Sequence, residues 1–430
     1  MSLSPFDAAA VLVVLVATFG LFNHRFLRLP SSVAMTGMGA VASLLIAAVD
    51  YLLPTAGLSE AAAGFLSGIN FHVVLLDGML SFLLFAGALH VDWTEMHRGR
   101  WPILVLSTIG VLVSTALIGG GFYAATRALG IAVPFPWCVV FGALISPTDP
   151  VAVMAVLKRI NCPPVLQATV AGESLFNDGV GVVVFSIVLA AALGNQEVQL
   201  AGAALEFLRE AGGGVLLGLA VGWLGFFAMR SIDDYNVELM ISLAIVMGGY
   251  ASASWVGVSG PVAMAVAGLL IGNAGVDQAM SEMTRDHVLK FWALIDELLN
   301  AVLFLLIGLE IIAISPSPAL LLLGLLSIPL LLLARAISVM VPLQAMRTLT
   351  GWPALVTLVW GGLRGGISVA LALSLPEGAP RTAVLTVTYV TVLFSVLVQG
   401  GSVARVLKRV GEPCSTEGLG EGARVPAIRS

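Results

Sequence analysis

The chain has 430 residues, of which 59% are hydrophobic and only 10% are charged. Soluble domains carry roughly a quarter of charged residues, and so few charges could not cover a water-soluble surface of this size. A soluble globular protein is therefore excluded. The net charge is −5, and the sequence has no basic patch with interleaved aromatic residues. No nucleic-acid partner is therefore expected.

The long apolar runs predict an all-α membrane protein, because they are uninterrupted rather than short and alternating. About thirteen segments are long enough to cross a bilayer, at roughly 20 residues each. They lie near residues 8–22, 33–53, 71–91, 101–126, 135–157, 165–193, 203–229, 237–256, 261–275, 288–314, 317–341, 353–375 and 383–407. We therefore expect a transmembrane domain over 1–410 and a short tail over 411–430.

The basic residues predict the orientation of these spans, since they gather in cytoplasmic loops. Odd-numbered loops and the tail hold most of the lysines and arginines, whereas even-numbered loops and their borders hold only Arg127, Arg209 and Arg381. The C-terminus is therefore expected in the cytoplasm and the N-terminus outside, in a cell (inner) membrane.

The fifth span reads FGALISPTDPVAVMAVLKR, in which Pro147 and Pro150 flank Thr148 and Asp149. Proline removes a backbone donor and clashes with the preceding turn, which predicts a broken helix at this point. A helix broken in the middle of the membrane leaves backbone carbonyl groups unpaired, and the dipoles of its two halves point at a site. The simpler alternative is a proline kink with a solvated aspartate.

The sixth span contains GESLFNDG, in which Glu173, Ser174, Asn177 and Asp178 follow one another closely. On a helix, Ser174 and Asp178 share one face and Glu173 and Asn177 share another. A carboxylate beside a hydroxyl offers the hard oxygen ligands that a small dehydrated cation needs. The alternative is a polar network that only ties helices together.

The eleventh span holds a lone Arg335, and an unpaired guanidinium at that depth would be prohibitive. The possible partners are Glu173, Asp178 and Asp149. We expect Glu173, because it lies on the helix face away from Ser174 and Asp178.

The twelfth span reads LVWGGLRGGISVALALSLP, with Gly362 and Gly365 on either side of Arg364. Paired glycines predict a weak or unwound helix, although they could also form a packing face. One interrupted span in each half of a chain is a pointer to a transporter site between inverted repeats. The design of the two spans, rather than any sequence identity between them, indicates such a repeat.

Other polar residues also lie within or near the ends of the predicted spans. Asp296, Glu297 and Asn300 in the tenth span are expected to face a neighbouring helix or water, and Asp77 and Glu238 lie near span ends where water is in reach. The histidines all fall near span ends and are expected to be interfacial.

The strings ISPTDPVAV, GESLFNDGVGVVVF, LLNAVLFLLIGLE and GGLRGGISVALAL strongly resemble the NhaP/NHE branch of sodium/proton antiporters. The resemblance extends over roughly residues 10–410, and the four motifs occur in the right order. It implies an NhaA-like antiporter fold of thirteen spans, a homodimer, and crossed, unwound fifth and twelfth helices. The ion-site core is then built mainly from 101–193 and 317–407, with the remainder mostly a dimerisation bundle.

The resemblance also implies residue roles. Asp178 is then the carboxylate that binds the proton and the metal ion, Na⁺. Ser174 and Thr148 are direct ligands, and Asp149 contributes through water. Asn177 bridges the broken helix and the site, and Glu173 pairs with Arg335. Arg364 matches the arginine of the crossing, without an assigned role.

The expected function is exchange of Na⁺ or Li⁺ for H⁺, without a cofactor and with membrane lipid around the protein. Electrogenic relatives carry two adjacent aspartates, whereas this chain has Asn177 before Asp178, so electroneutral 1:1 exchange is expected. The alternatives are a K⁺/H⁺ antiporter of the same fold, a cation channel, and a membrane-embedded aspartyl protease. The protease would need Tyr-Asp and Gly-x-Gly-Asp patterns, and neither occurs.

Overall fold

The computed structural model describes residues 5–53, 62, 64–65, 74–160, 162–194, 200–313, 317–346 and 351–409. Nearly all of these residues are helical, and the described part of the chain forms no β-sheet. The tail predicted over 411–430 lies outside the described residues.

The helices of the first half follow the predicted apolar ranges, except α6, which lies between the third and fourth of them. They are α1 (Pro5–Phe22), α2 (Ser31–Leu52), α5 (Leu80–Leu89), α6 (Trp93–Arg98), α7 (Arg100–Val105), α8 (Val111–Ala128), α9 (Phe135–Ile145), α10 (Val151–Arg159) and α11 (Pro164–Ala192). Single π-helical segments at Asn23–Leu27, Val74–Met79 and Leu106–Gly110 extend or join them.

The second half continues in the same way. Its helices are α12 (Leu200–Phe207), α13 (Gly213–Arg230), α14 (Tyr235–Val256), α15 (Gly260–Leu270), α16 (Val276–Gln278), α17 (Glu282–Leu309), α18 (Pro318–Met346), α19 (Trp352–Trp360), α20 (Gly366–Leu373), α21 (Ala379–Leu393) and α22 (Gly401–Arg409). Further π-helical segments lie at Leu208–Gly212, Ile271–Gly275 and Phe394–Gly400, and a 3₁₀ turn at Glu310–Ala313.

Membrane insertion explains why so much of the chain is helical. In lipid each backbone N–H and C=O must be satisfied within the chain, and an apolar helix does this alone. Within the described residues, nine helical segments are long and apolar enough to cross a bilayer, and three shorter apolar helices accompany them. The number of crossings stays a prediction, whereas the multi-pass helical architecture is confirmed.

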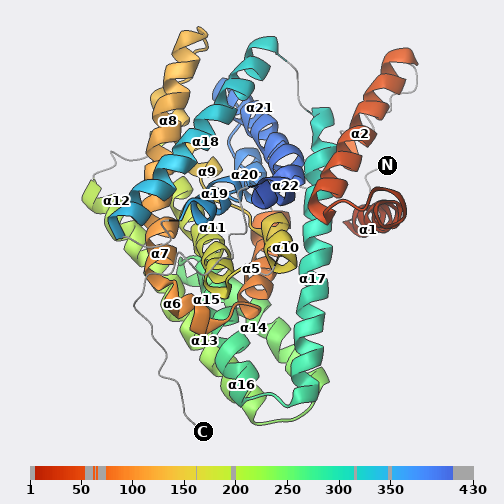
Figure 1. Ribbon diagram of the computed structural model, residues 1–430, viewed down its shortest axis with the longest axis vertical. Coiled ribbons are helices and arrows are strands. Elements are labelled where there is room, and N and C mark those ends of the chain that lie inside the picture. Colours follow the sequence, from red (N-terminus) through yellow and green to blue (C-terminus); the bar gives the residue numbers. More distant parts are fainter. Residues whose placement is uncertain are drawn as a thin grey trace.

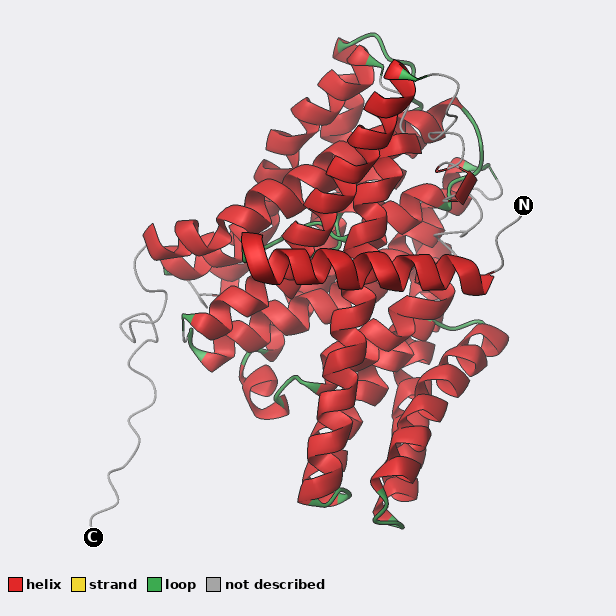
Figure 2. Ribbon diagram, turned by 90° about the vertical axis from the view of Figure 1, so that its right-hand side faces the viewer, coloured by secondary structure: helices red, strands yellow, loops and turns green. Residues whose placement is uncertain are grey.

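Helix α1 differs from the others in its direction. Figure 2 shows it running across the long helices of the bundle, with the N-terminus at one end. Only 11% of its apolar stretch is buried, so few described residues pack against it.

Local sequence signals set several helix ends. The carboxylate of Asp92 accepts hydrogen bonds from the N–H groups of Thr94 (2.7 Å) and Glu95 (3.3 Å), which caps α6. Asp234 caps α14 in the same way. Gly257 ends α14 with φ of 72°, a conformation that favours glycine.

The long helix α17 ties two parts of the bundle together (Figure 1). Its C-terminal half packs directly against α2, where a side chain at Gly39 would lie 2.8 Å from the carbonyl oxygen of Leu305. The Thr36 hydroxyl donates to the carbonyl of Phe304 at 3.1 Å. Its N-terminal half packs against α14, where the Trp292 indole N–H donates to the Ser242 hydroxyl at 3.0 Å. Side chains along α17 thus hold fixed positions relative to α2 and α14.

Candidate ion-binding site

Two interrupted helices meet near the centre of the molecule. Helix α9 ends at Ile145 and α10 begins at Val151, with Pro147 and Pro150 between them. The Asp149 carboxylate turns back to accept the N–H of Val151 at 2.9 Å. A carboxylate at this place complements the positive N-terminal end of α10.

The second interruption lies between α19 and α20, over residues 361–365. The Asp149 N–H donates to the carbonyl of Leu363 at 2.8 Å, and the two segments form an isolated antiparallel bridge. Gly365 is required at this contact, because a Cβ there would lie 2.7 Å from the Cβ of Asp149. The paired breaks therefore bring backbone from both halves of the chain into one place.

Thr148 in the first break is bound to α11 by two side chains. The Asn177 amide donates to the Thr148 hydroxyl oxygen at 2.8 Å, and its carbonyl oxygen accepts the Thr148 N–H at 3.4 Å. The Thr148 and Ser174 hydroxyls share a hydrogen bond of 3.3 Å. All three residues are buried, so the broken segment is held against α11 by a small, closed network.

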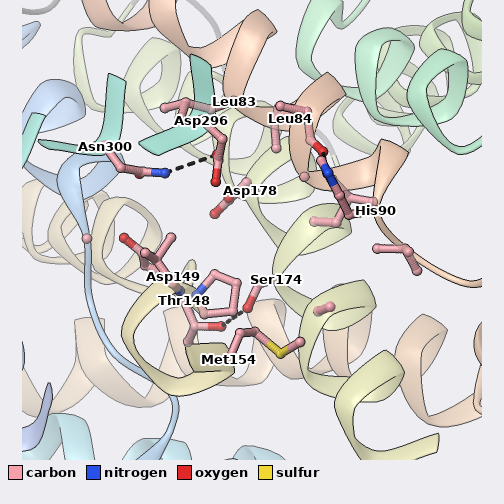
Figure 3. A pocket seen from close by; sticks show the side chains of 18 of the residues that line it. Leu83, Leu84, His90, Thr148, Asp149, Met154, Ser174, Asp178, Asp296 and Asn300 are labelled. Carbon is pink, nitrogen blue, oxygen red and sulfur yellow. Dashed lines mark hydrogen bonds between the residues drawn. The ribbon is translucent and has the colours of Figure 1, made fainter. Parts of the chain in front are cut away.

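Asp178 lies one turn beyond Ser174 on α11 and is only partly buried. It lines a cavity of about 640 Å³ together with Thr148, Asp149 and Ser174. Figure 3 shows its carboxyl group pointing into this space. Among the described residues, no cationic group lies within ion-pair distance of Asp178, so its carboxylate is accessible to a small ion.

Glu173 on the same helix has the opposite environment. Both of its carboxylate oxygens accept from the two terminal nitrogens of Arg335, the Nη2 contact measuring 3.0 Å. Arg335 also donates from Nε and Nη2 to the carbonyl of Leu358, at 3.1 and 2.9 Å. Glu173 is 1% exposed and Arg335 is 7% exposed. Of the three possible partners, the structure pairs Arg335 with Glu173.

Gly362 makes room for this pair. A Cβ at that position would lie 2.5 Å from Nε of Arg335. The second helix break therefore also shapes the space for the guanidinium.

Arg364 is buried without a carboxylate partner within ion-pair distance among the described residues. Its guanidinium donates to the carbonyls of Ser146 (2.5 Å) and Pro147 (3.0 Å), just beyond the last turn of α9. These carbonyls continue the negative end of the α9 dipole, which favours a cation. The backbone N–H of Arg364 donates to the Ser395 hydroxyl at 2.8 Å. Arg364 thus links the two breaks.

The cavity also includes residues that the sequence analysis did not assign to the ion site. Asp296 and Asn300 of α17 line it, and so does His90 at the end of α5. The four-residue spacing of Asp296 and Asn300 in an apolar helix was the available signal, since it places two polar groups on one face. The expectation for Glu238 was wrong, because it is fully buried between helices rather than in reach of water.

Comparison with known protein families identifies the family to which this chain belongs. The family model described as "Sodium/hydrogen exchanger, transmembrane" matches residues 11–409. The chain belongs to the sodium/hydrogen exchanger family. This membership confirms the resemblance found in the motifs and places the protein among transporters.

Named relatives in this exchanger family align over most of the chain. The Na(+)/H(+) antiporter NhaP of Pseudomonas aeruginosa is 44% identical over 420 residues, which cover 95% of this chain and 98% of that protein. The Na(+)/H(+) antiporter NhaH of Halobacillus dabanensis is 33% identical over 392 residues, covering 90% and 93% of the two chains.

A solved structure confirms the fold of this exchanger. The sodium proton antiporter MjNhaP1 from Methanocaldococcus jannaschii superposes with a TM-score of 0.66 at 21% identity. The match covers 89% of this chain and 99% of that one. At this identity the likeness concerns the fold alone.

Proposed function

We propose that this protein exchanges Na⁺ or Li⁺ for H⁺ across the cell membrane, with both ions competing for Asp178. The observation that carries the proposal is the accessible carboxylate of Asp178 on the cavity, beside a Glu173 that Arg335 neutralises. A carboxylate without a fixed cation can take either a proton or a metal ion. Family membership and the antiporter names of the relatives support the same reaction.

The oxygen groups around Asp178 suit an alkali cation. The hydroxyls of Thr148 and Ser174 are proposed as direct ligands, and Asp149 as a group that acts through a bound water. Hard oxygen donors of this kind replace part of the hydration shell of a small cation. Asn177 and Arg364 then act as positioning residues, because they hold the first break through Thr148 and through the carbonyls of Ser146 and Pro147.

The exchange is proposed to be electroneutral. Asn177 precedes Asp178 and is engaged with Thr148 as an uncharged bridge. With one exchanging carboxylate, either one Na⁺ or one H⁺ neutralises the site. Each half-cycle then carries one charge in opposite directions, and membrane potential has no net effect on the cycle.

The transport cycle is proposed to be alternating access in a homodimer surrounded by lipid. A core built mainly from 101–193 and 317–407 moves against the remaining helices and carries Asp178 from one face to the other. Glu95, Lys158 and Gln167 also line the cavity, and Lys158 belongs to one of the basic loops. The distribution of basic residues supports assigning these loops to the cytoplasm, with the N-terminus outside.

Purified protein in sealed vesicles with an imposed pH gradient tests this proposal. Addition of Na⁺ or Li⁺ should dissipate the gradient at a rate that a potassium–valinomycin voltage clamp leaves unchanged. A rate that follows the clamped voltage would contradict electroneutrality. A response to K⁺ in place of Na⁺ would favour the K⁺/H⁺ alternative, and flux without coupled proton movement would favour a channel.

A further inference from the structure

Asp296 lines the cavity from a helix outside the proposed core. It lies on α17, outside the two segments 101–193 and 317–407, whereas Asp178 and Asp149 lie within the first of them. All three carboxylates line the same cavity. Figure 3 shows Asp296 and Asp178 pointing into the space from different helices.

The Asp296 side chain is oriented by its own helix. The Asn300 amide donates to Oδ1 of Asp296 at 3.0 Å, which leaves the second carboxylate oxygen for a group in the cavity. Among the described residues, no lysine, arginine or histidine forms an ion pair with Asp296. His90 and Lys158 line the same cavity, and neither lies within ion-pair distance of Asp296. The negative charge of Asp296 is therefore available to an entering cation.

Helix α17 is fixed to helices outside the proposed core. It packs closely on α2 around Gly39 and joins α14 through the Trp292–Ser242 hydrogen bond. Movement of the core would therefore carry Asp178 away from Asp296. Asp296 and Asp178 face one cavity only while it is open as in this structure.

We propose that Asp296 is a cation-capturing residue that acts from one face of the membrane. It holds a partly hydrated monovalent cation next to Asp178, and the cation passes to Asp178 before the core moves. Asp296 stays behind, so it lowers the KM for the cation on the face to which this cavity opens. This inference rests on the proposed exchange at Asp178.

The test compares Asp296→Asn with a matched control, Glu297→Gln. Glu297 is the next residue on α17 and is exposed, and it does not line the cavity. Both variants remove one negative charge from the same helical turn. Exchange is measured in oriented vesicles, with Na⁺ added to each face in turn.

Asp296→Asn should raise the KM for Na⁺ about tenfold on the cavity-open face, equivalent to about 1.4 kcal/mol. The maximal rate and the KM on the opposite face should stay within about twofold of wild type, because the substitution leaves Asp178 unchanged. For Glu297→Gln, the maximal rate and the KM on both faces should stay within the same range. An unchanged KM, or equal changes on both faces, would overturn the inference.

A second variant separates charge from folding. Asp296→Glu keeps the carboxylate and should retain most of the low KM, whereas a merely structural role for Asp296 would make it as impaired as Asp296→Asn. Absence of exchange by the wild-type protein in the same vesicles would instead contradict the proposed function. If the wild-type protein exchanges the ions and the Asp296 variants have the wild-type KM on both faces, only this inference is contradicted.

Discussion

Helix α11 carries two carboxylates only five residues apart, and the structure gives them opposite environments. Glu173 is 1% exposed and both oxygens are bound by Arg335. Asp178 faces a cavity and has no cation within ion-pair distance among the described residues. Arginine stays protonated in proteins, so Glu173 cannot exchange its partner. The comparison indicates that a permanent ion pair holds the helix while an accessible carboxylate is left for transport.

The largest effect is expected when the accessible carboxylate is removed. Asp178→Asn keeps the size of the side chain, but the neutral amide cannot take up a proton and offers Na⁺ no negative charge. We expect exchange to fall to the background of protein-free vesicles. The variant should purify as a monodisperse species with wild-type thermal stability, since no described ion pair is lost. A wild-type rate would remove Asp178 from the mechanism.

Removal of the paired carboxylate should act on stability instead. Glu173→Ala leaves the Arg335 guanidinium buried without its partner, which costs about 3–5 kcal/mol for pairs of this type. The melting temperature in detergent should fall clearly below that of Asp178→Asn. The double variant Glu173→Gln/Arg335→Gln should recover part of this loss, because no buried charge is then left alone. Equal stability of wild type and Glu173→Ala would show that the pair is dispensable.

A smaller effect is expected at the contact between the two helix breaks. Gly365→Ala would push a methyl group against the Asp149 side chain, and overpacking of this kind costs about 1–3 kcal/mol. We expect a lower maximal exchange rate, because Asp149 and Thr148 shift together. Gly120→Ala in α8 is the matched control, since a Cβ there meets no atom within 4 Å. Similar rates for both variants would argue against a tight fit at the breaks.

The smallest effect is expected from a single hydroxyl ligand. Ser174→Ala removes one oxygen beside Asp178 and the 3.3 Å hydrogen bond to Thr148. A loss of about 1 kcal/mol corresponds to a KM for Na⁺ raised about fivefold. Titration of the exchange rate with Na⁺ measures this change. A lower maximal rate at unchanged KM would mean that Ser174 supports the helix break rather than the ion.

Helix positions were predictable because a membrane-spanning helix requires a long apolar run, which is visible in the sequence. The breaks were indicated by Pro147, Pro150, Gly362 and Gly365, whose local chemistry disrupts a helix. The Glu173–Arg335 pair followed from the cost of an isolated buried charge together with helix periodicity. These inferences needed only local patterns or a strong energetic demand.

Other features depended on tertiary packing that the pattern does not encode. The packing of α17 places Asp296 and Asn300 on the wall of the cavity that Asp178 also lines, although nothing in the tenth span specifies that position. Glu238 on α14 is buried, and α14 packs against α17, where Trp292 donates to Ser242. The partners of Arg364 are backbone carbonyls, which exist in every residue and leave no sequence signal. The cation preference likewise depends on distances among several oxygens.

Proton release on Na⁺ binding tests the central role of Asp178 most directly. Purified protein in weakly buffered detergent solution is titrated with Na⁺ while released protons are measured with a pH indicator. The account predicts that Na⁺ displaces about one proton from wild type under conditions where the site is protonated, and none from Asp178→Asn. It also predicts that Na⁺ binds more weakly as the pH falls, because the two ions compete for one carboxylate. Equal proton release by Asp178→Asn, or Na⁺ binding by wild type without proton release at any pH, would contradict it.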